Sequence, residues 1–179
     1  RRAPGAPRMP PPRRAEEPAR AAPATLDWAP APTGPRAARF TTADGLVIHG
    51  DYHVLKPALP CPGAAILLHG NESDRRCWEP LLPALKARNL AVLAIDVRCH
   101  GASTEWERAL RAPLTRDDIP TQTSEMPRDV AAAVAFLEKD GFAAERIALV
   151  GSSVGGGVAL QYACRNPRIP CVAALSPQR

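Results

Sequence analysis

The feature that most constrains this chain is a serine flanked by glycines at the end of a short apolar run. Residues 147–150 are all apolar, and Gly151 follows them directly. Ser153 stands at the centre of a Gly-x-Ser-x-Gly pattern that ends at Gly155, where a helix-like pattern begins. Such a turn needs glycines on both sides because the neighbouring backbones come too close for a Cβ atom. The pattern predicts a sharp strand-to-helix turn that raises the Ser153 hydroxyl above a helix N-terminus.

The partners that such a serine needs are not found later in the chain. A serine hydroxyl is a weak nucleophile unless a histidine takes its proton and an acid orients that histidine. The sequence contains no Asp, Glu or His after Glu145. We therefore assign neither role to a residue of this chain, and we expect its 179 residues to be the N-terminal portion of a longer hydrolase.

The composition changes near residue 38. Residues 1–36 hold ten of the 21 prolines, and residues 1–40 carry eight arginines against three acidic residues. A segment rich in Pro, Ala and Arg cannot bury enough apolar surface to fold by itself. We predict a disordered leader at 1–37 and one partial domain at 38–179. The arginines suit nucleic acid or an anionic membrane, but a solvated spacer is favoured and no nucleic-acid partner is expected.

Hydropathy and the spacing of the cysteines argue against a membrane-spanning helix, a zinc site and a disulfide framework. No apolar run reaches the roughly 18 residues that a membrane-spanning helix needs. The five cysteines contain no Cys-x-x-Cys pair, which argues against a zinc site and a disulfide framework. Cys164 and Cys171 are predicted to pack as small buried hydrophobic side chains. The sequence is compatible with a cytoplasmic protein and with an exported one whose signal has been removed, and it favours no oligomeric state.

Apolar strands alternate with helical patterns after residue 38. The turn Ala43-Asp44-Gly45 predicts a hairpin between 38–42 and 46–54. Buried strands are expected at 64–68, 90–95, 147–150 and 171–175, and helices after Asp74, from Pro127 to Gly141 and after Ser153, with 102–123 irregular. This alternation predicts an α/β fold with a mostly parallel sheet and helices on both faces. Ligands of such sheets lie beyond the C-terminal ends of the strands.

Two further motifs follow predicted strands. His69-Gly70-Asn71 closes the strand at 64–68. Gly70 allows a sharp turn there, so we expect the main-chain N–H of Asn71 to be one donor of an oxyanion hole and that of Val154 to be the other. His69 is expected to be structural rather than catalytic.

The second of these motifs runs from Asp96 to Ser103 and follows the strand at 90–95. Asp96 and Arg98 are expected to bond the loop backbone and fix the end of the strand. His100 is a candidate base, but this loop is expected to shape the scaffold, because a base must lie within hydrogen-bond reach of the hydroxyl. Asp129, on the predicted helix that starts at Pro127, is expected to be a solvated or capping residue.

The glycines at 151–157 also suggest a phosphate-binding loop, since such turns at helix N-termini hold anions. No Lys follows in the position that a P-loop requires, and Leu160 occupies the place of the third glycine of a dinucleotide-binding loop. The nucleophile interpretation of Ser153 is therefore favoured, and an anion-binding doubly wound domain is the weaker alternative.

Taken together, the three motifs resemble those of the α/β-hydrolase family in order and spacing, and most of all its serine aminopeptidase and dienelactone-hydrolase-like branches. The resemblance covers about residues 38–177. It implies an α/β-hydrolase-like domain that is C-terminally incomplete, with no metal and no organic cofactor. Cys99 departs from the pattern, because the family usually has a glycine there, and we expect either backbone strain or an accessible thiol at this position.

The resemblance implies a serine hydrolase that acts on a small-molecule ester, or on an amide, through an acyl-enzyme on Ser153. His69, Gly70, Gly151 and Gly155 would form the supporting loops. The 179 residues alone are expected to be inactive. The alternative is a catalytically inactive α/β-hydrolase-like module that binds or interacts with a partner, which the missing histidine and acid motivate.

Overall fold

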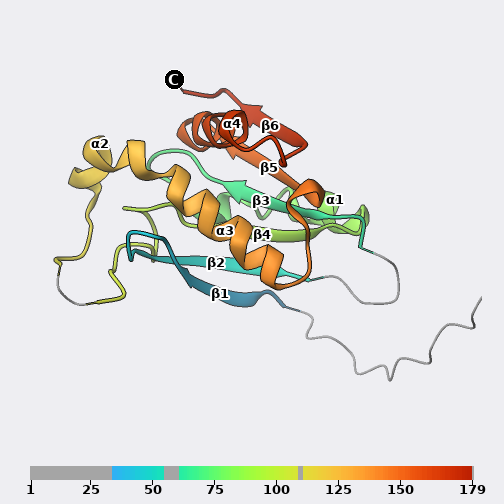
Figure 1. Cartoon of the computed structure of the whole chain (residues 1–179), viewed down its shortest axis with the longest axis horizontal. Helices are drawn as coiled ribbons and strands as arrows, with labels where there is room; N and C mark the ends of the chain where they lie inside the picture. The colour runs from blue at the N-terminus through green and yellow to red at the C-terminus, as the bar shows by residue number, and fades with distance from the viewer. Residues whose placement is uncertain (1–33, 55–60, 109–110, 179) are drawn as a thin grey trace, which may run out of the picture. The chain divides into compact units, whose positions relative to one another are not determined.

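A six-stranded sheet organises the residues that the computed structural model describes, which are 34–54, 61–108 and 111–178 (Figure 1). Its strands are β1 (Arg36–Thr41), β2 (Val47–His53), β3 (Ala64–Leu68), β4 (Ala91–Ile95), β5 (Ile147–Ser152) and β6 (Cys171–Leu175). Their order across the sheet is β1-β2-β4-β3-β5-β6. The hairpin β1–β2 is antiparallel and β2 pairs antiparallel with β4, whereas β4, β3, β5 and β6 run parallel. The predicted α/β class with a mostly parallel sheet is confirmed.

The proposed leader lies almost wholly outside the described residues. Strand β1 begins at Arg36, two residues before the boundary that composition indicated. The predicted hairpin turn is present, and Gly45 has a φ of 90° there. Such a positive φ is readily adopted only by glycine, which explains why the turn falls at this position.

Helices cover both faces of the sheet. Helices α3 (Pro127–Lys139) and α4 (Val154–Arg165) pack on one face, and Figure 1 shows α3 crossing in front of the central strands. On the opposite face lie the 3₁₀ turn η1 (Arg75–Trp78) and helix α1 (Leu82–Ala87). Every residue of β3 and β4 is buried, as expected for apolar strands between two helical layers. Among the described residues, no helix has the length and hydropathy needed to cross a membrane.

The helix predicted after Asp74 is interrupted. The chain makes the 3₁₀ turn η1 first and α1 begins only at Leu82, because Pro80 and Pro83 lack the N–H that a continuous helix would use. Asp74 caps η1 as expected, since its side chain accepts a hydrogen bond from the Arg76 N–H at 2.8 Å. Hydrogen bonds from Arg76 also hold the pKa of Asp74 at about 2.

The described residues of the segment 102–123 are more ordered than the sequence indicated. It contains a 3₁₀ turn η2 (Arg116–Asp118) and a short helix α2 (Ile119–Gln122), followed by η3 (Thr123–Glu125), which leads into α3. Thr115 and Asp118 form a capping box at the start of η2. The Thr-x-x-Asp spacing followed by Pro120 is a helix-start signal that the polar composition concealed.

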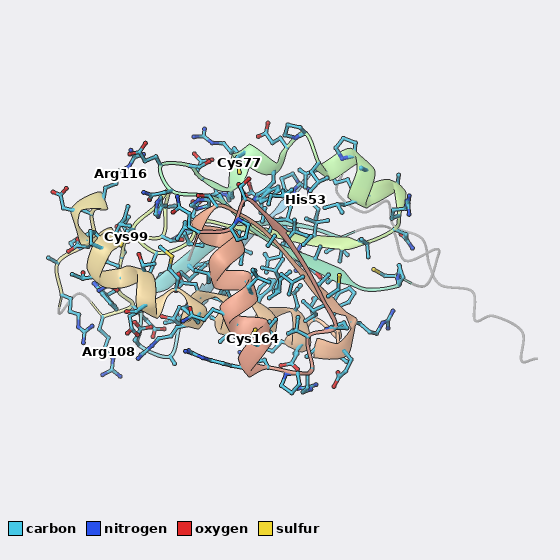
Figure 2. All side chains as sticks on the ribbon, turned by 90° about the horizontal axis from the view of Figure 1, so that it is seen from above. His53, Cys77, Cys99, Arg108, Arg116 and Cys164 are labelled. Carbon is cyan, nitrogen blue, oxygen red and sulfur yellow. The ribbon has the colours of Figure 1, made fainter. Side chains whose placement is uncertain are left out.

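Strand β6 forms as predicted, but it is not buried. It lies at the edge of the sheet, paired with β5, and its residues alternate between exposed and half-buried. The prediction that Cys164 and Cys171 are buried is wrong, because both are exposed. Cys171 begins this edge strand, and Cys164 lies on helix α4, whose buried side chains are at other positions (Figure 2).

The buried Arg98 joins the end of β4 to α3, to α2 and to the hairpin turn. Arg98 follows β4, and its Nε and Nη2 donate to Oδ1 of Asp129 on α3 at 2.9 and 2.7 Å. Its Nη1 and Nη2 reach Asp44 in the hairpin turn at 3.1 and 3.3 Å, and Nη1 also donates to Gln122 at 3.1 Å. The guanidinium thus bonds side chains of three elements rather than the loop backbone that we expected it to bond.

The expectation that Asp129 is solvated or a cap is likewise wrong. Its side chain is completely buried, and its Oδ2 accepts the main-chain N–H of Arg98 at 2.9 Å. Asp129 therefore receives three hydrogen bonds from one residue 31 positions earlier in the chain. The sequence could not reveal this pairing, because only the packing of α3 against the end of β4 creates it.

We predict that Asp129→Ala lowers the free energy of unfolding by about 3–5 kcal/mol, because it leaves the buried Arg98 guanidinium without its main counter-ion. Urea unfolding followed by circular dichroism measures the effect. Glu125→Ala is the matched control, since Glu125 pairs with Arg128 at 2.6 Å on the surface, and its loss costs less than about 1 kcal/mol. Equal effects of the two substitutions would contradict this account.

Candidate active site

The candidate site lies between β3 and β5, where the order in which strands are added to the sheet changes direction. From β3 the chain crosses to β4 on one side, and from β5 it crosses to β6 on the other, although β3 and β5 are neighbours. In open α/β sheets the crevice between two such strands, beyond their carboxyl ends, is where ligands bind. The loops that follow β3 and β5 carry the His69 and Ser153 motifs.

The turn after β5 has the geometry that the glycine pattern predicted. Ser153 has φ 52° and ψ −119°, a sparsely populated conformation for a residue with a side chain, and α4 begins at the next residue. A Cβ on Gly151 would lie 2.3 Å from the Gly155 oxygen, and one on Gly155 would lie 2.4 Å from the carbonyl oxygens of Leu68 and His69. Both glycines are therefore required by backbone packing.

The main chain of Ser153 is fully engaged, whereas its side chain makes no cap to α4. The Ser153 N–H donates to the Leu175 carbonyl at 2.8 Å, and its carbonyl accepts from the N–H groups of Gly157 and Gln178, each at 3.1 Å. The residue is half-buried. The structure therefore fixes the backbone at the serine, and within the described part of the chain no hydrogen bond engages its hydroxyl.

The loop after β3 packs directly against this turn. A Cβ on Gly70 would lie 3.1 Å from the Cβ of Ser153. His69 is completely buried; its Nε2 accepts the Val97 N–H at 3.1 Å, so the ring proton is on Nδ1, which donates to the Gly70 carbonyl at 2.7 Å. Burial lowers the pKa of His69, which favours this neutral form.

The hydrogen bond from His69 also sets the direction of the next amide. In a trans peptide the C=O and the N–H point to opposite sides of the bond. Because the Gly70 carbonyl is held against the His69 ring, the Asn71 N–H is directed away from that ring. No peptide bond among the described residues is cis.

A cavity of about 550 Å³ opens beside Asn71 and Val154, the two expected oxyanion donors. Its lining residues are all uncharged: Asn71, Ile119, Thr123, Ser124, Val154, Gly157, Val158, Gln161 and Gln178. Ile119 and Thr123 come from the segment predicted to be irregular, which is why sequence reasoning assigned them no role. The volume is within the range of pockets that hold small organic ligands.

The loop Asp96–Ser103 is hydrogen-bonded to the segment that follows β3. Asp96 is completely buried; its Oδ1 accepts the Arg75 N–H at 2.8 Å and its Oδ2 accepts the Ala102 N–H at 2.9 Å. The expectation that Asp96 holds loop backbone is confirmed. His100 contacts the Arg98 carbonyl and the Asn71 side chain, which is a scaffold position as expected.

Of the two consequences expected at Cys99, only backbone strain is found. Cys99 has a φ of 66°, in the left-handed region where the usual glycine is comfortable. Cys99 is only 2% exposed, so the expectation of an accessible thiol is wrong. Burial also raises the pKa of this thiol to about 11.

Gly155→Ala is predicted to destabilise the fold by about 1–3 kcal/mol or more, because the added Cβ overlaps the Leu68 and His69 carbonyl oxygens. Thermal unfolding measures the loss. Gly34→Ala is the control, since a Cβ at that position has no described atom within 4 Å. This substitution is expected to change stability by less than about 0.5 kcal/mol. A stable Gly155→Ala protein would contradict the close approach of the two loops.

Native alkylation is expected to separate the cysteines by burial. Cys164 is exposed and should react with iodoacetamide, whereas Cys99 is buried with a raised pKa and should react only after unfolding. Mass spectrometry of the alkylated peptides before and after denaturation measures both rates. Modification of Cys99 in the folded protein at the rate of Cys164 would show that its loop opens to solvent.

Comparison with known proteins places this geometry in a family. A model of the family described as "Alpha/beta hydrolase family" matches residues 65–178. Among solved structures, the esterase Pf2001 of Pyrococcus furiosus is 25% identical with a TM-score of 0.62, and the match covers 80% of this chain and 52% of the esterase. No protein with a curated description matches the sequence.

Two further solved structures share the fold. An epoxide hydrolase from an endophytic Streptomyces is 24% identical with a TM-score of 0.60, over 80% of this chain and 37% of its own. The bottromycin epimerase BotH is 27% identical with a TM-score of 0.57, over 77% and 47%. This chain thus spans about half the length of the esterase and less of the other two. The family match covers well over half of the residues, and the chain belongs to the alpha/beta hydrolase family.

Proposed function

We propose that the protein to which this chain belongs is a serine hydrolase that cleaves carboxylic esters through an acyl-enzyme on Ser153. The observation that carries the proposal is the strained turn at Ser153, which stands between Gly151 and Gly155 with its hydroxyl uncommitted. Backbone strain of this kind costs about 1–3 kcal/mol and persists where the surrounding structure enforces it, often at active sites. Cys99 and Glu72 have a positive φ as well, so the proposal rests on this strain together with the position of the serine between two required glycines and beside the loop after β3.

The oxyanion hole in this proposal consists of two main-chain N–H groups. Val154 opens α4, and the first N–H groups of a helix have no intrahelical partner. The Asn71 N–H comes from the loop packed against Ser153, and both residues line the 550 Å³ cavity. The positive end of the α4 dipole adds to the stabilisation of a developing negative charge.

The reaction would proceed in two steps. The Ser153 Oγ attacks the ester carbonyl carbon while its proton passes to a histidine, and the carbonyl oxygen becomes an oxyanion held by the two amides. Collapse of this intermediate breaks the C–O bond and releases the alcohol, which receives the proton from the histidine. Water then attacks the acyl-enzyme by the same route, releases the acid and restores the serine.

The base and the acid are assigned to sequence outside these 179 residues. The chain spans about half the length of the Pyrococcus esterase, so a complete hydrolase of this family has room for them elsewhere. The ester preference rests on that esterase and on the uncharged cavity lining, which suits a neutral small molecule. An amide substrate, and membership of the serine aminopeptidase or dienelactone-hydrolase-like branch, are finer parts of the same proposal.

A fluorophosphonate probe tests the nucleophile. In the protein expressed from its complete reading frame we expect the probe to label Ser153, because the activated hydroxyl attacks phosphorus as it attacks a carbonyl carbon. Ser153→Ala should abolish labelling and lower kcat for a p-nitrophenyl ester by about 10³-fold or more. Peptide mass spectrometry identifies the labelled residue.

Ser152→Ala is the matched control, since Ser152 is the adjacent hydroxyl at the end of β5 and should keep labelling and turnover. Labelling that survives in Ser153→Ala would refute the assignment. A complete protein that folds but never reacts with the probe would favour the alternative, a catalytically inactive binding or interaction module. The 179 residues alone are expected to remain unlabelled.

A further inference from the structure

His100 is a buried imidazole that the proposed mechanism does not use. Its side chain is 2% exposed and lies in the loop after β4. Nδ1 is 2.9 Å from the Arg98 carbonyl oxygen, and Nε2 is 3.1 Å from the side-chain amide of Asn71. Its ring also meets the His69 ring edge-on, with centroids 5.0 Å apart. One end of this ring is therefore tied to its own loop and the other to the loop that follows β3.

We propose that His100 is a positioning residue for the oxyanion hole, which holds the Asn71 side chain so that the Asn71 main-chain N–H keeps its direction. This inference rests on the proposed function. A carbonyl oxygen only accepts, so the proton on Nδ1 is committed to Arg98. Nε2 faces Oδ1 of Asn71 at 3.1 Å. Turning this amide over places its NH2 at the same position, where it donates to an Nε2 that carries no proton.

The two histidines hold the same peptide from opposite ends. His69 fixes the Gly70 carbonyl at 2.7 Å, and His100 fixes the Asn71 side chain at 3.1 Å. The peptide bond between Gly70 and Asn71 carries the proposed oxyanion donor, so its plane is held on both sides. Each ring also supports the other through their edge-on contact.

The loop requires such support because its own sequence does not fix it. Gly70 has wide backbone freedom, and Asn71 itself is exposed. Glu72, the next residue, has a φ of 57°, which is uncommon for a residue with a side chain. Among the described residues, the bond to His100 is the hydrogen bond that holds the Asn71 side chain. A displacement of about 1 Å at a catalytic donor can cost 100-fold in rate.

Two substitutions separate the ends of the ring. In His100→Asn the shorter amide can replace Nδ1 and keep the bond to Arg98, but it has no atom at the Nε2 position. In His100→Gln the amide reaches the Nε2 position and can restore the bond to Asn71. In the complete protein we expect His100→Asn to lower kcat by about 10- to 100-fold with KM within about twofold. We expect His100→Gln to recover at least about a third of the lost rate.

A double-mutant cycle tests whether His100 acts through Asn71. Asn71→Ala removes an exposed side chain and should fold, and it should lower kcat about as much as His100→Asn. In the Asn71→Ala background the His100→Asn change should have less than about a twofold effect. Effects that multiply in the double variant, or a His100→Asn protein with unchanged kcat, would overturn the proposal.

A spectroscopic measurement tests the contact without relying on activity. Asn71→Ala should shift the ¹⁵N resonance of His100 Nε2. The resonances of His53 should stay unchanged, because His53 pairs with Val92 at the opposite end of the strands (Figure 2). An unchanged His100 resonance would overturn the proposal. If the resonance shifts but Ser153→Ala retains full turnover, the contact between His100 and Asn71 exists but the proposed function is wrong. The positioning role is then wrong as well, because it rests on that function.

Discussion

The arrangement of this domain depends on the close approach of two backbones, the turn between β5 and α4 and the end of β3. A Cβ at Gly155 would lie 2.4 Å from the carbonyl oxygens of Leu68 and His69, so helix α4 can start where it does only because that position has no side chain. The register of the two strands, in which Leu68 faces Gly151, sets this approach. Any group placed on Ser153 is thereby held beside the loop that follows β3.

Buried polar side chains connect the loops near this junction. Asp96 accepts the Ala102 N–H within the loop after β4 and joins that loop to η1 through the Arg75 N–H, and Arg98 joins it to α3 and to the hairpin turn. Both side chains are completely buried, so their charges are stable only because each is matched by hydrogen-bonded partners. The loops that carry His69 and His100 thus belong to one hydrogen-bonded network, and the turn at Ser153 packs against it at Gly70.

The order of the strands explains why the candidate residues meet although they are far apart in sequence. β3 and β5 are neighbours, but the connections that follow them leave in opposite directions. A crevice forms at this point in sheets of this kind, and here it is continued by α2 and α4 as the cavity beside Asn71 and Val154. The fold by itself carries several chemistries, as a solved esterase, an epoxide hydrolase and an epimerase of the same fold illustrate. Function therefore has to be argued from the site.

Local patterns were sufficient for the strands, the hairpin, the cap at Asp74 and the glycine-flanked turn, because each depends on residues close together in the chain. They were not sufficient for Asp129, which looks like a surface residue of a helix until α3 packs against Arg98. They also misjudged Cys171 and Cys164, since burial depends on where a strand or a helix face lies in the sheet. The contact between His100 and Asn71 spans 29 positions of the chain and exists only because β3 and β4 are paired side by side. By itself the sequence determined which turns are possible; the tertiary structure decided which side chains those turns bring together, because such contacts depend on the order and register of the strands.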